Sequence, residues 1–198
     1  LVKGIFVNAA GQRFINEDCY HGRVSRTIVD QPGKKVWLLV DNAIFDRPME
    51  LARVDLTAVG ETWEEVEAEL GFVPGTLATS VAQYNAHAAA GVDPMWHKAP
   101  KWLKPLNEAP FAALEFDLDS SYFSFFTLGG LETLPTGEVL DMRGKAIPGL
   151  YAAGRVTCGL PRWGAGYSSG MSLADCTFFG RMAGRSVAAR GADTALAA

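Results

Sequence analysis

A glycine-rich segment near the end of the chain has the composition of a ligand-binding turn. Residues 149–180 hold a predicted strand ending at Gly154, a loop with further glycines, and a helix start at Ser169-Gly170-Met171-Ser172. Clustered glycines let the backbone approach a flat ligand, and a new helix presents free N–H groups with partial positive charge. Such an end suits a reduced flavin, whose N1–C2=O edge becomes negative when a hydride arrives. A packed surface loop before a helix has the same composition, so the segment alone leaves both interpretations open.

Three other motifs suggested by the residue types are disfavoured by their position or spacing in the sequence. Residues 164–170 approach a dinucleotide fingerprint, but about ten residues separate them from the strand and the chain ends after the next helix. Residues 166–170 match the G-x-S-x-G nucleophile elbow, whose hydrolases need a histidine after the serine, yet the last histidine is His97. The carboxylates Glu64, Glu65, Glu67 and Glu69 are predicted to form a solvated helix face rather than an acid–base or metal cluster.

The composition excludes several classes of partner. Hydrophobic residues make up 48% of the 198, the net charge is −4, and no basic block favours nucleic acid or an anionic membrane. No apolar run approaches the roughly 20 residues that span a bilayer. Three distant cysteines disfavour a disulfide framework and suit packed thiols in a cytoplasmic protein. The three histidines lack metal-ligand spacing, so we expect no metal site.

Periodicity and turn residues predict an α+β fold in two parts. The first part should hold a hairpin, a buried strand, two helices, a long irregular connection and a second strand; the second part should hold short strands, a strand before the glycine-rich loop, a final helix and a frayed tail. The predicted ranges are 4–16 for the hairpin, 36–40 and 111–118 for the strands, 62–70 and 77–90 for the helices, 93–110 for the connection, 150–154 for the later strand, 171–190 for the final helix and 191–198 for the tail. Thr62-Trp63-Glu64-Glu65 has the pattern of a capping box and marks the start of the first helix.

Several motifs, in a fixed order, resemble the fumarate reductase/succinate dehydrogenase flavoprotein superfamily, which includes 3-ketosteroid dehydrogenases. They are Gly4-Ile5-Phe6-Val7-Asn8, Gly11-Gln12-Arg13-Phe14-Ile15-Asn16-Glu17, Val81-Ala82-Gln83-Tyr84-Asn85, Thr127-Leu128-Gly129-Gly130-Leu131, Ile147-Pro148-Gly149-Leu150-Tyr151-Ala152-Ala153-Gly154 and Phe179-Gly180-Arg181-Met182-Ala183-Gly184. The resemblance implies a substrate-capping (clamp) domain at 1–126 and the C-terminal segment of a Rossmann-like FAD-binding domain at 127–198. It also implies a small-molecule substrate held between cap and flavin. Because the chain starts at Leu1 and lacks the family's upstream glycine fingerprint, we expect a fragment whose N-terminal FAD-binding lobe is missing.

The chain departs from the fumarate reductase pattern at three positions. Phe125 and Phe126 stand where that pattern has a histidine before T-x-G-G, and Tyr167 stands nearest its arginine in the glycine-rich loop. Tyr20, three residues after the cap glutamate, replaces another arginine. A dicarboxylate needs cationic, bidentate partners, so these aromatic residues disfavour fumarate or succinate.

The replacements resemble the ketosteroid branch, in which tyrosines abstract a proton beside a ketone and hold its carbonyl oxygen. This implies Tyr20 as the acid/base, Tyr167 as the carbonyl-binding group and Tyr122 as a further catalytic candidate. For each, a tyrosine packed in the domain interface is the alternative.

The resemblance also implies the residues around cofactor and substrate. Gly154, Arg155, Gly170, Ser172 and Leu173 should contact FAD, although the family usually has an acidic or amide residue where Arg155 stands. Phe125, Phe126 and Trp163 should line an apolar substrate pocket, with ordinary core as the alternative.

The expected function is therefore FAD-dependent oxidoreduction of a CH–CH bond, with an apolar ketone such as a 3-ketosteroid as favoured substrate. Two alternatives stay open: a fumarate-type reductase acting on another organic acid, and an isolated cap module without catalysis. We expect the fragment by itself to be inactive and to bind FAD weakly.

Overall fold

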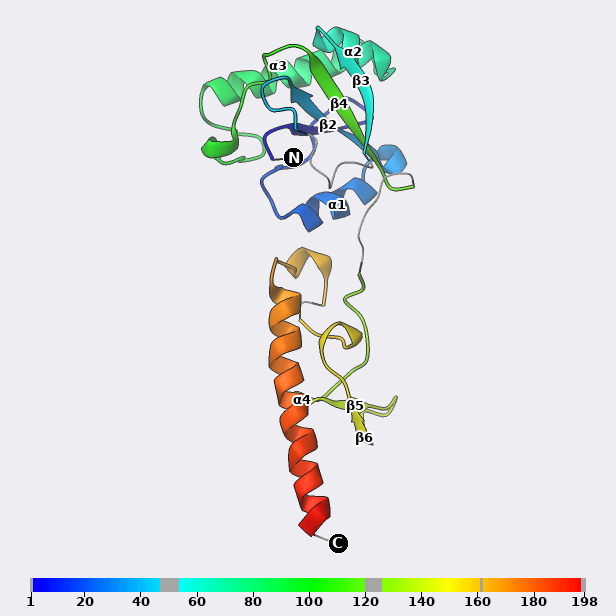
Figure 1. Cartoon of the computed structure of the whole chain (residues 1–198). Helices are drawn as coiled ribbons and strands as arrows, with labels where there is room; N and C mark the ends of the chain where they lie inside the picture. Colours follow the sequence, from blue (N-terminus) through cyan, green and yellow to red (C-terminus); the bar gives the residue numbers. More distant parts are fainter. Residues whose placement is uncertain (1, 47–53, 120–125, 161, 197–198) are drawn as a thin grey trace. The chain divides into compact units, whose positions relative to one another are not determined.

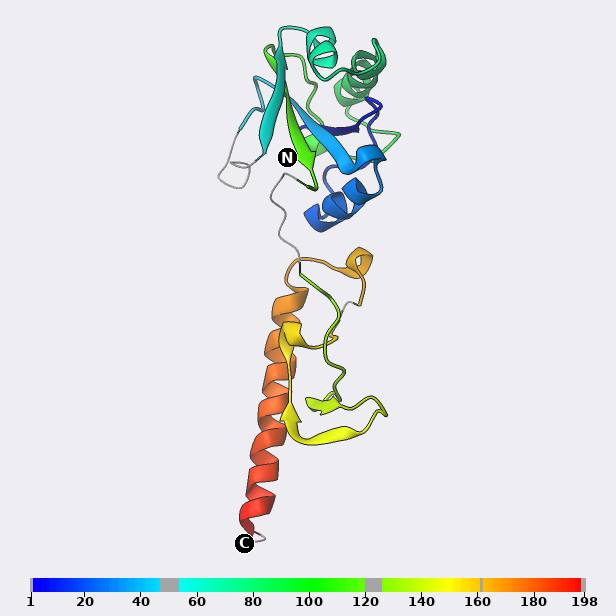
Figure 2. The same cartoon turned by 90° about the vertical axis from the view of Figure 1, so that its right-hand side faces the viewer.

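Two separate units make up the chain, Leu1–Ser124 and Phe125–Ala198. The computed structural model describes residues 2–46, 54–119, 126–160 and 162–196 (Figures 1 and 2). The longer elements are β1 (Ile5–Asn8), α1 (His21–Val29), β2 (Lys35–Asp41), β3 (Asp55–Gly60), α2 (Trp63–Glu69), α3 (Thr76–Ala89), β4 (Phe111–Asp117), β5 (Glu138–Leu140), β6 (Ala146–Tyr151) and α4 (Met171–Leu196). Short 3-10 turns are η1 (Pro32–Lys34), η3 (Pro100–Trp102), η4 (Gly154–Val156) and η5 (Gly164–Gly166).

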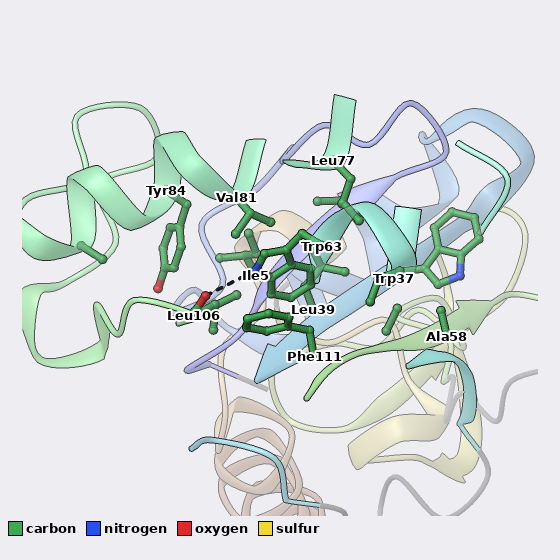
Figure 3. Close-up of a cluster of buried hydrophobic side chains, with 14 of the residues drawn as sticks. Ile5, Trp37, Leu39, Ala58, Trp63, Leu77, Val81, Tyr84, Leu106 and Phe111 are labelled. Carbon is green, nitrogen blue, oxygen red and sulfur yellow. Dashed lines mark hydrogen bonds between the residues drawn. The ribbon is translucent and has the colours of Figure 1, made fainter. Parts of the chain in front are cut away.

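The first unit is built on a four-stranded antiparallel sheet with the order β1-β2-β4-β3. Side chains alternate along β2, so that Trp37 and Leu39 face one side while Val36, Leu38 and Val40 face the other. Each side has its own apolar core. The α2 and α3 helices supply the core on the first side, where Leu77, Val81 and Tyr84 point toward the sheet (Figure 3). The α1 helix covers the other side with Val24 and Ile28.

Capping residues fix where α2 and α3 begin. As predicted, Thr62 Oγ1 accepts a hydrogen bond from Glu65 N at 3.2 Å at the start of α2. The prediction that Glu67 lies on a solvated face is wrong, since this residue is only 3% exposed. Its carboxylate accepts the backbone N–H groups of Gly75 and Leu77, both at 2.5 Å, at the start of α3. Gly75 has no side chain with which to cap α3, and Glu67 fills that role.

The second unit packs the β5–β6 hairpin beside the long helix α4 (Figure 1). The turn before β5 comes so close to α4 that a Cβ on Gly137 would lie 2.6 Å from Ala183 Cβ. Gly137 also has a φ of +96°, so both space and backbone conformation require glycine there. The unit combines helices and strands, and the whole chain is a mixed α/β structure.

Some predicted boundaries need correction. The turn at Gly11 forms, but its second arm makes only an isolated bridge between Val7 and Arg13, and the regular ladder of β1 is formed with β2. The strand expected at 150–154 is β6, which ends at Tyr151. The α4 helix continues to Leu196 rather than fraying from residue 191. Two elements were not predicted, α1 and β3.

Candidate functional site

The second unit brings three distant segments together at the end of β6. Leu131 N donates to Val156 O at 2.9 Å and Cys158 N donates to Leu131 O at 2.8 Å, which places the Thr127–Leu131 motif against the turn after the strand. The η4 turn at Gly154–Val156 in turn packs on α4. The motifs that carry the family resemblance in this half of the chain are therefore neighbours in space.

Glycines allow this close packing. Gly154 has a φ of +77°, and a Cβ there would lie 2.8 Å from Cys176 Sγ on α4. A Cβ on Gly130 would lie 2.5 Å from Val156 O. Both contacts are far shorter than real side chains accept, so part of the glycine pattern serves the packing of the protein itself.

The first turn of α4 leaves backbone donors open. Gly170, with a φ of +90°, precedes the helix and has no side chain to cap it. Met171 N donates to Ser168 O at 3.2 Å and Ala174 N donates to Gly170 O at 2.9 Å. Among the described residues, the N–H groups of Ser172 and Leu173 have no acceptor. This helix end is therefore suited to an oxygen acceptor with partial or full negative charge.

Arg155 is held beside this helix end by an ion pair. Its Nη2 lies 3.0 Å from Asp175 Oδ2, and the Asp175 side chain is 3% exposed. A Cβ on Gly159 would overlap both partners of the pair. Arg155 Nε and Nη1 are buried without an acceptor in the part of the chain that the structure describes. Buried donors of this kind are costly unless a partner is supplied, and an acceptor-rich ligand would supply one.

Tyr167 and Ser172 form a hydroxyl pair at the same end of α4. The oxygen–oxygen distance is 2.8 Å, and the geometry allows either atom to be the donor. The Phe126 ring packs edge-on against Tyr167 with the ring centroids 5.4 Å apart. The structure therefore places the predicted carbonyl-binding tyrosine beside two other predicted site residues.

Tyr20 lies in the first unit, at the residue before α1. It is half-buried, and its ring centroid lies 4.4 Å from that of His21. A Cβ on Gly22 would approach Tyr20 Cε1 to 2.7 Å, so the glycine leaves room for the phenol ring.

A buried ion network anchors the segment that leads to Tyr20. Glu17 accepts hydrogen bonds from Arg13 Nε at 2.8 Å and from Phe6 N at 3.1 Å. Arg13 Nη1 also pairs with Asp93 at 2.8 Å, and Lys98 Nζ lies 3.4 Å from Glu17. Burial lowers the pKa of Arg13, but its hydrogen bonds and charge attraction to the two carboxylates outweigh this and raise the pKa overall. The network was not predicted, because Arg13 and Glu17 lie in an irregular segment and their partners Asp93 and Lys98 lie about 80 residues further along the chain.

Tyr84 is a tyrosine of a different kind. It is 2% exposed, the Arg13 guanidinium lies 5.1 Å from its ring centroid, and its Oη accepts Lys104 N at 3.3 Å. Burial raises the pKa of Tyr84 to about 12. This phenol stays protonated near neutral pH and belongs to the core.

Several predicted site residues are exposed or lie outside the described residues. Trp163 is 73% exposed, Leu173 73% and Phe126 56%, so in this chain they are not core. Tyr122 and Phe125 lie outside the described residues. The three cysteines are free, and Cys176 is exposed rather than packed.

The described residues contain neither a cluster of metal-binding side chains nor a helix suited to span a membrane. Among them, no three His, Cys, Asp or Glu side chains come close enough together to hold a metal ion. No helix among them combines the length and apolar character needed to cross a membrane.

Residues 3–171 match the family model described as an FAD binding domain. The chain belongs to this family. The match confirms the resemblance drawn from the sequence and indicates FAD as the cofactor. Within the family, the chain resembles both fumarate reductases and 3-ketosteroid dehydrogenases.

The chain is 32% identical to the probable fumarate reductase Ifc3 of Shewanella frigidimarina strain NCIMB 400, over 97% of the chain and 32% of that protein. Among solved structures, it is 42% identical to the 3-ketosteroid-Δ4-(5α)-dehydrogenase of Rhodococcus jostii RHA1 in complex with 4-androstene-3,17-dione, with a TM-score of 0.77 over 93% of the chain and 38% of that structure. The open conformation of a flavocytochrome c3 fumarate reductase matches with 30% identity and a TM-score of 0.61, over 93% of the chain and 32% of that structure. The chain thus spans about a third of the length of these relatives.

Proposed function

We propose that this chain is the capping and C-terminal part of an FAD-dependent dehydrogenase that acts on the CH–CH bond beside a ketone, with a 3-ketosteroid as the favoured substrate. One observation carries the proposal: Tyr20 and Tyr167 stand at the positions that the family resemblance matches to arginines of fumarate reductases, in a chain 42% identical to a 3-ketosteroid dehydrogenase. A phenol can donate to a carbonyl oxygen but cannot replace a bidentate cation on a carboxylate.

The residues around the start of α4 fit a flavin. The open N–H groups of Ser172 and Leu173 and the unpartnered donors of Arg155 all require acceptors, and a flavin ring and its ribityl chain are rich in them. We assign Gly154 and Gly170 to the same site, because they bring backbone to the helix end without a side chain in the way. The chemistry that FAD supplies when bound is the acceptance or release of two electrons as a hydride.

The two tyrosines take different roles in the proposal. Tyr20 Oη moves the proton at the carbon next to the ketone, and Tyr167 Oη donates a hydrogen bond to the carbonyl oxygen, where negative charge develops during this step. Tyr122 stays a further candidate. Phe125, Phe126 and Trp163 supply apolar surface for the substrate, and the exposure of Phe126 and Trp163 leaves their rings available for it.

The proposal assigns residues 1–126 to the cap and 127–198 to the C-terminal segment of a Rossmann-like FAD domain. The rest of the FAD site would come from an N-terminal lobe of a longer protein. The proposal that another part of a longer protein completes the FAD site is supported by the chain's coverage of only about a third of its relatives' length. We expect residues 1–198 purified alone to be colourless and inactive, because most contacts to the cofactor's phosphates and adenine would lie on the other lobe.

A fumarate-type reductase acting on another organic acid is the second candidate, favoured by the 32% identity to the probable fumarate reductase. The deciding experiment is to express the longer flavoprotein and assay it with a 3-ketosteroid and with fumarate. We expect turnover of the steroid ketone, strongly slowed but still measurable in Tyr20→Phe and Tyr167→Phe. Turnover of fumarate alone, insensitive to both substitutions, would refute the ketone assignment.

A further inference from the structure

The hydroxyl pair of Tyr167 and Ser172 links the end of the η5 turn to the first turn of α4. Tyr167 follows the η5 turn, where its N–H donates to Gly164 O at 3.1 Å. Ser172 lies in the first turn of α4, and both side chains are partly buried. A serine in a helix often returns its hydroxyl to a carbonyl of its own preceding turn. Ser172 instead directs its hydroxyl to the phenol at 2.8 Å.

A hydroxyl carries one proton to donate and two lone pairs that accept. If Tyr167 donates its proton to a ligand, the bond between the two hydroxyls must be donated by Ser172. A ketone oxygen can only accept, so it selects this arrangement. Packing of Phe126 against the Tyr167 ring holds the phenol plane while the hydroxyl bond fixes the direction of its proton.

We propose that Ser172 is a positioning residue that turns the Tyr167 proton toward a carbonyl acceptor and so favours ketones among the possible substrates. This inference rests on the proposed function and adds a residue role to it. It also revises the expected role of the Ser172 side chain: the hydroxyl serves Tyr167, while the backbone N–H of Ser172 remains the group that faces the cofactor.

The test uses the full-length flavoprotein with Ser172→Ala and Ser172→Thr. Loss of one hydrogen bond to the carbonyl-binding group should lower kcat for a 3-ketosteroid by about fivefold to tenfold, with KM little changed. Ser172→Thr keeps the hydroxyl and should stay within about twofold of the parent. Ser186→Ala is the matched control, because the Ser186 hydroxyl on the same helix donates to Met182 O, at 3.1 Å, a carbonyl of its own preceding turn.

FAD affinity and the visible flavin spectrum separate a role toward Tyr167 from a direct role toward the cofactor. The proposal expects both to be unchanged in Ser172→Ala. A weakened FAD affinity or a shifted spectrum in that variant, restored in Ser172→Thr, would show that the hydroxyl binds the flavin and would overturn the positioning role.

A double-mutant cycle completes the test. If Ser172 acts through Tyr167, Ser172→Ala should cause no further loss of kcat in the Tyr167→Phe background, whereas a full additional loss would refute the coupling. Tyr167→Phe with normal ketone turnover would contradict the proposed function itself. A slow Tyr167→Phe beside a normal Ser172→Ala would contradict only the positioning role, and a parent with no ketone turnover would overturn both.

Discussion

Leu173→Pro in the full-length flavoprotein tests whether the start of α4 stabilises the reduced cofactor. Proline removes the Leu173 N–H, which has no acceptor among the described residues, so the substitution breaks no internal hydrogen bond. The first turn of a helix is also the place where proline is best tolerated. Leu173→Ala is the control, since it removes the 73% exposed side chain but keeps the N–H group.

The expected size follows from the difference between two hydrogen bonds. A bond from the N–H to a neutral flavin carbonyl contributes roughly 1 kcal/mol, and a bond to the negatively charged reduced ring contributes about 2 kcal/mol. The reduced form therefore loses about 1 kcal/mol more, which for a two-electron couple makes the midpoint potential about 20 mV more negative.

Anaerobic redox titration of the two variants beside the parent gives the measurement. We expect Leu173→Ala to keep the parental potential and Leu173→Pro to fall below it. Equal potentials in both variants, with FAD fully bound, would refute the idea that this helix end faces the flavin.

Three further predictions concern the stability contributed by Glu67 and the ion pair beside Gly159. Glu67→Gln should lower the free energy of unfolding in urea by about 1–3 kcal/mol, because its carboxylate caps α3 through two backbone N–H groups; an unchanged unfolding midpoint would contradict the cap. Burial raises the pKa of Glu67, but its hydrogen bonds outweigh this and hold the pKa below its ordinary value. The stabilising contribution of Glu67 is therefore present at neutral pH and should be lost progressively below about pH 5. Urea unfolding midpoints that do not change from neutral to acid pH would contradict this prediction. Gly159→Ala should separate Arg155 from Asp175 and so weaken FAD binding in the full-length protein. Gly184→Ala is the control, because this exposed glycine of α4 has no positive φ, like Gly159, but has open space where its Cβ would lie. Equal FAD affinity in both variants would count against a cofactor role for Arg155.

Strong local signals predicted much of the fold. The apolar run of β2 and the Thr62 cap of α2 placed these elements to within a residue or two, because one short window contains the whole signal. The α1 helix was missed because Val24 and Ile28 are its only buried positions among polar neighbours. The β3 strand was missed because, as an edge strand, it alternates weakly, and its Val59 is 49% exposed.

The parts of the site that consist of consecutive family motifs could be predicted from the sequence. The parts that depend on contacts between residues far apart in the sequence could not. The glycine-rich loop and the start of α4 could be placed from sequence, since their glycines and turn residues are consecutive. Glu67 was predicted to be solvated because its neighbours are acidic. It is buried because it accepts hydrogen bonds at the start of α3, where Gly75 has no side chain to cap the helix. The pairing of Arg13 with Asp93 joins residues 80 positions apart, which no local pattern can reveal.

A structure of the full-length flavoprotein with FAD bound would show directly whether the start of α4 faces the flavin. We expect a flavin oxygen within hydrogen-bonding distance, about 3 Å, of the Ser172 or Leu173 N–H group. A flavin bound elsewhere, with the first turn of α4 packed against unrelated protein, would contradict it.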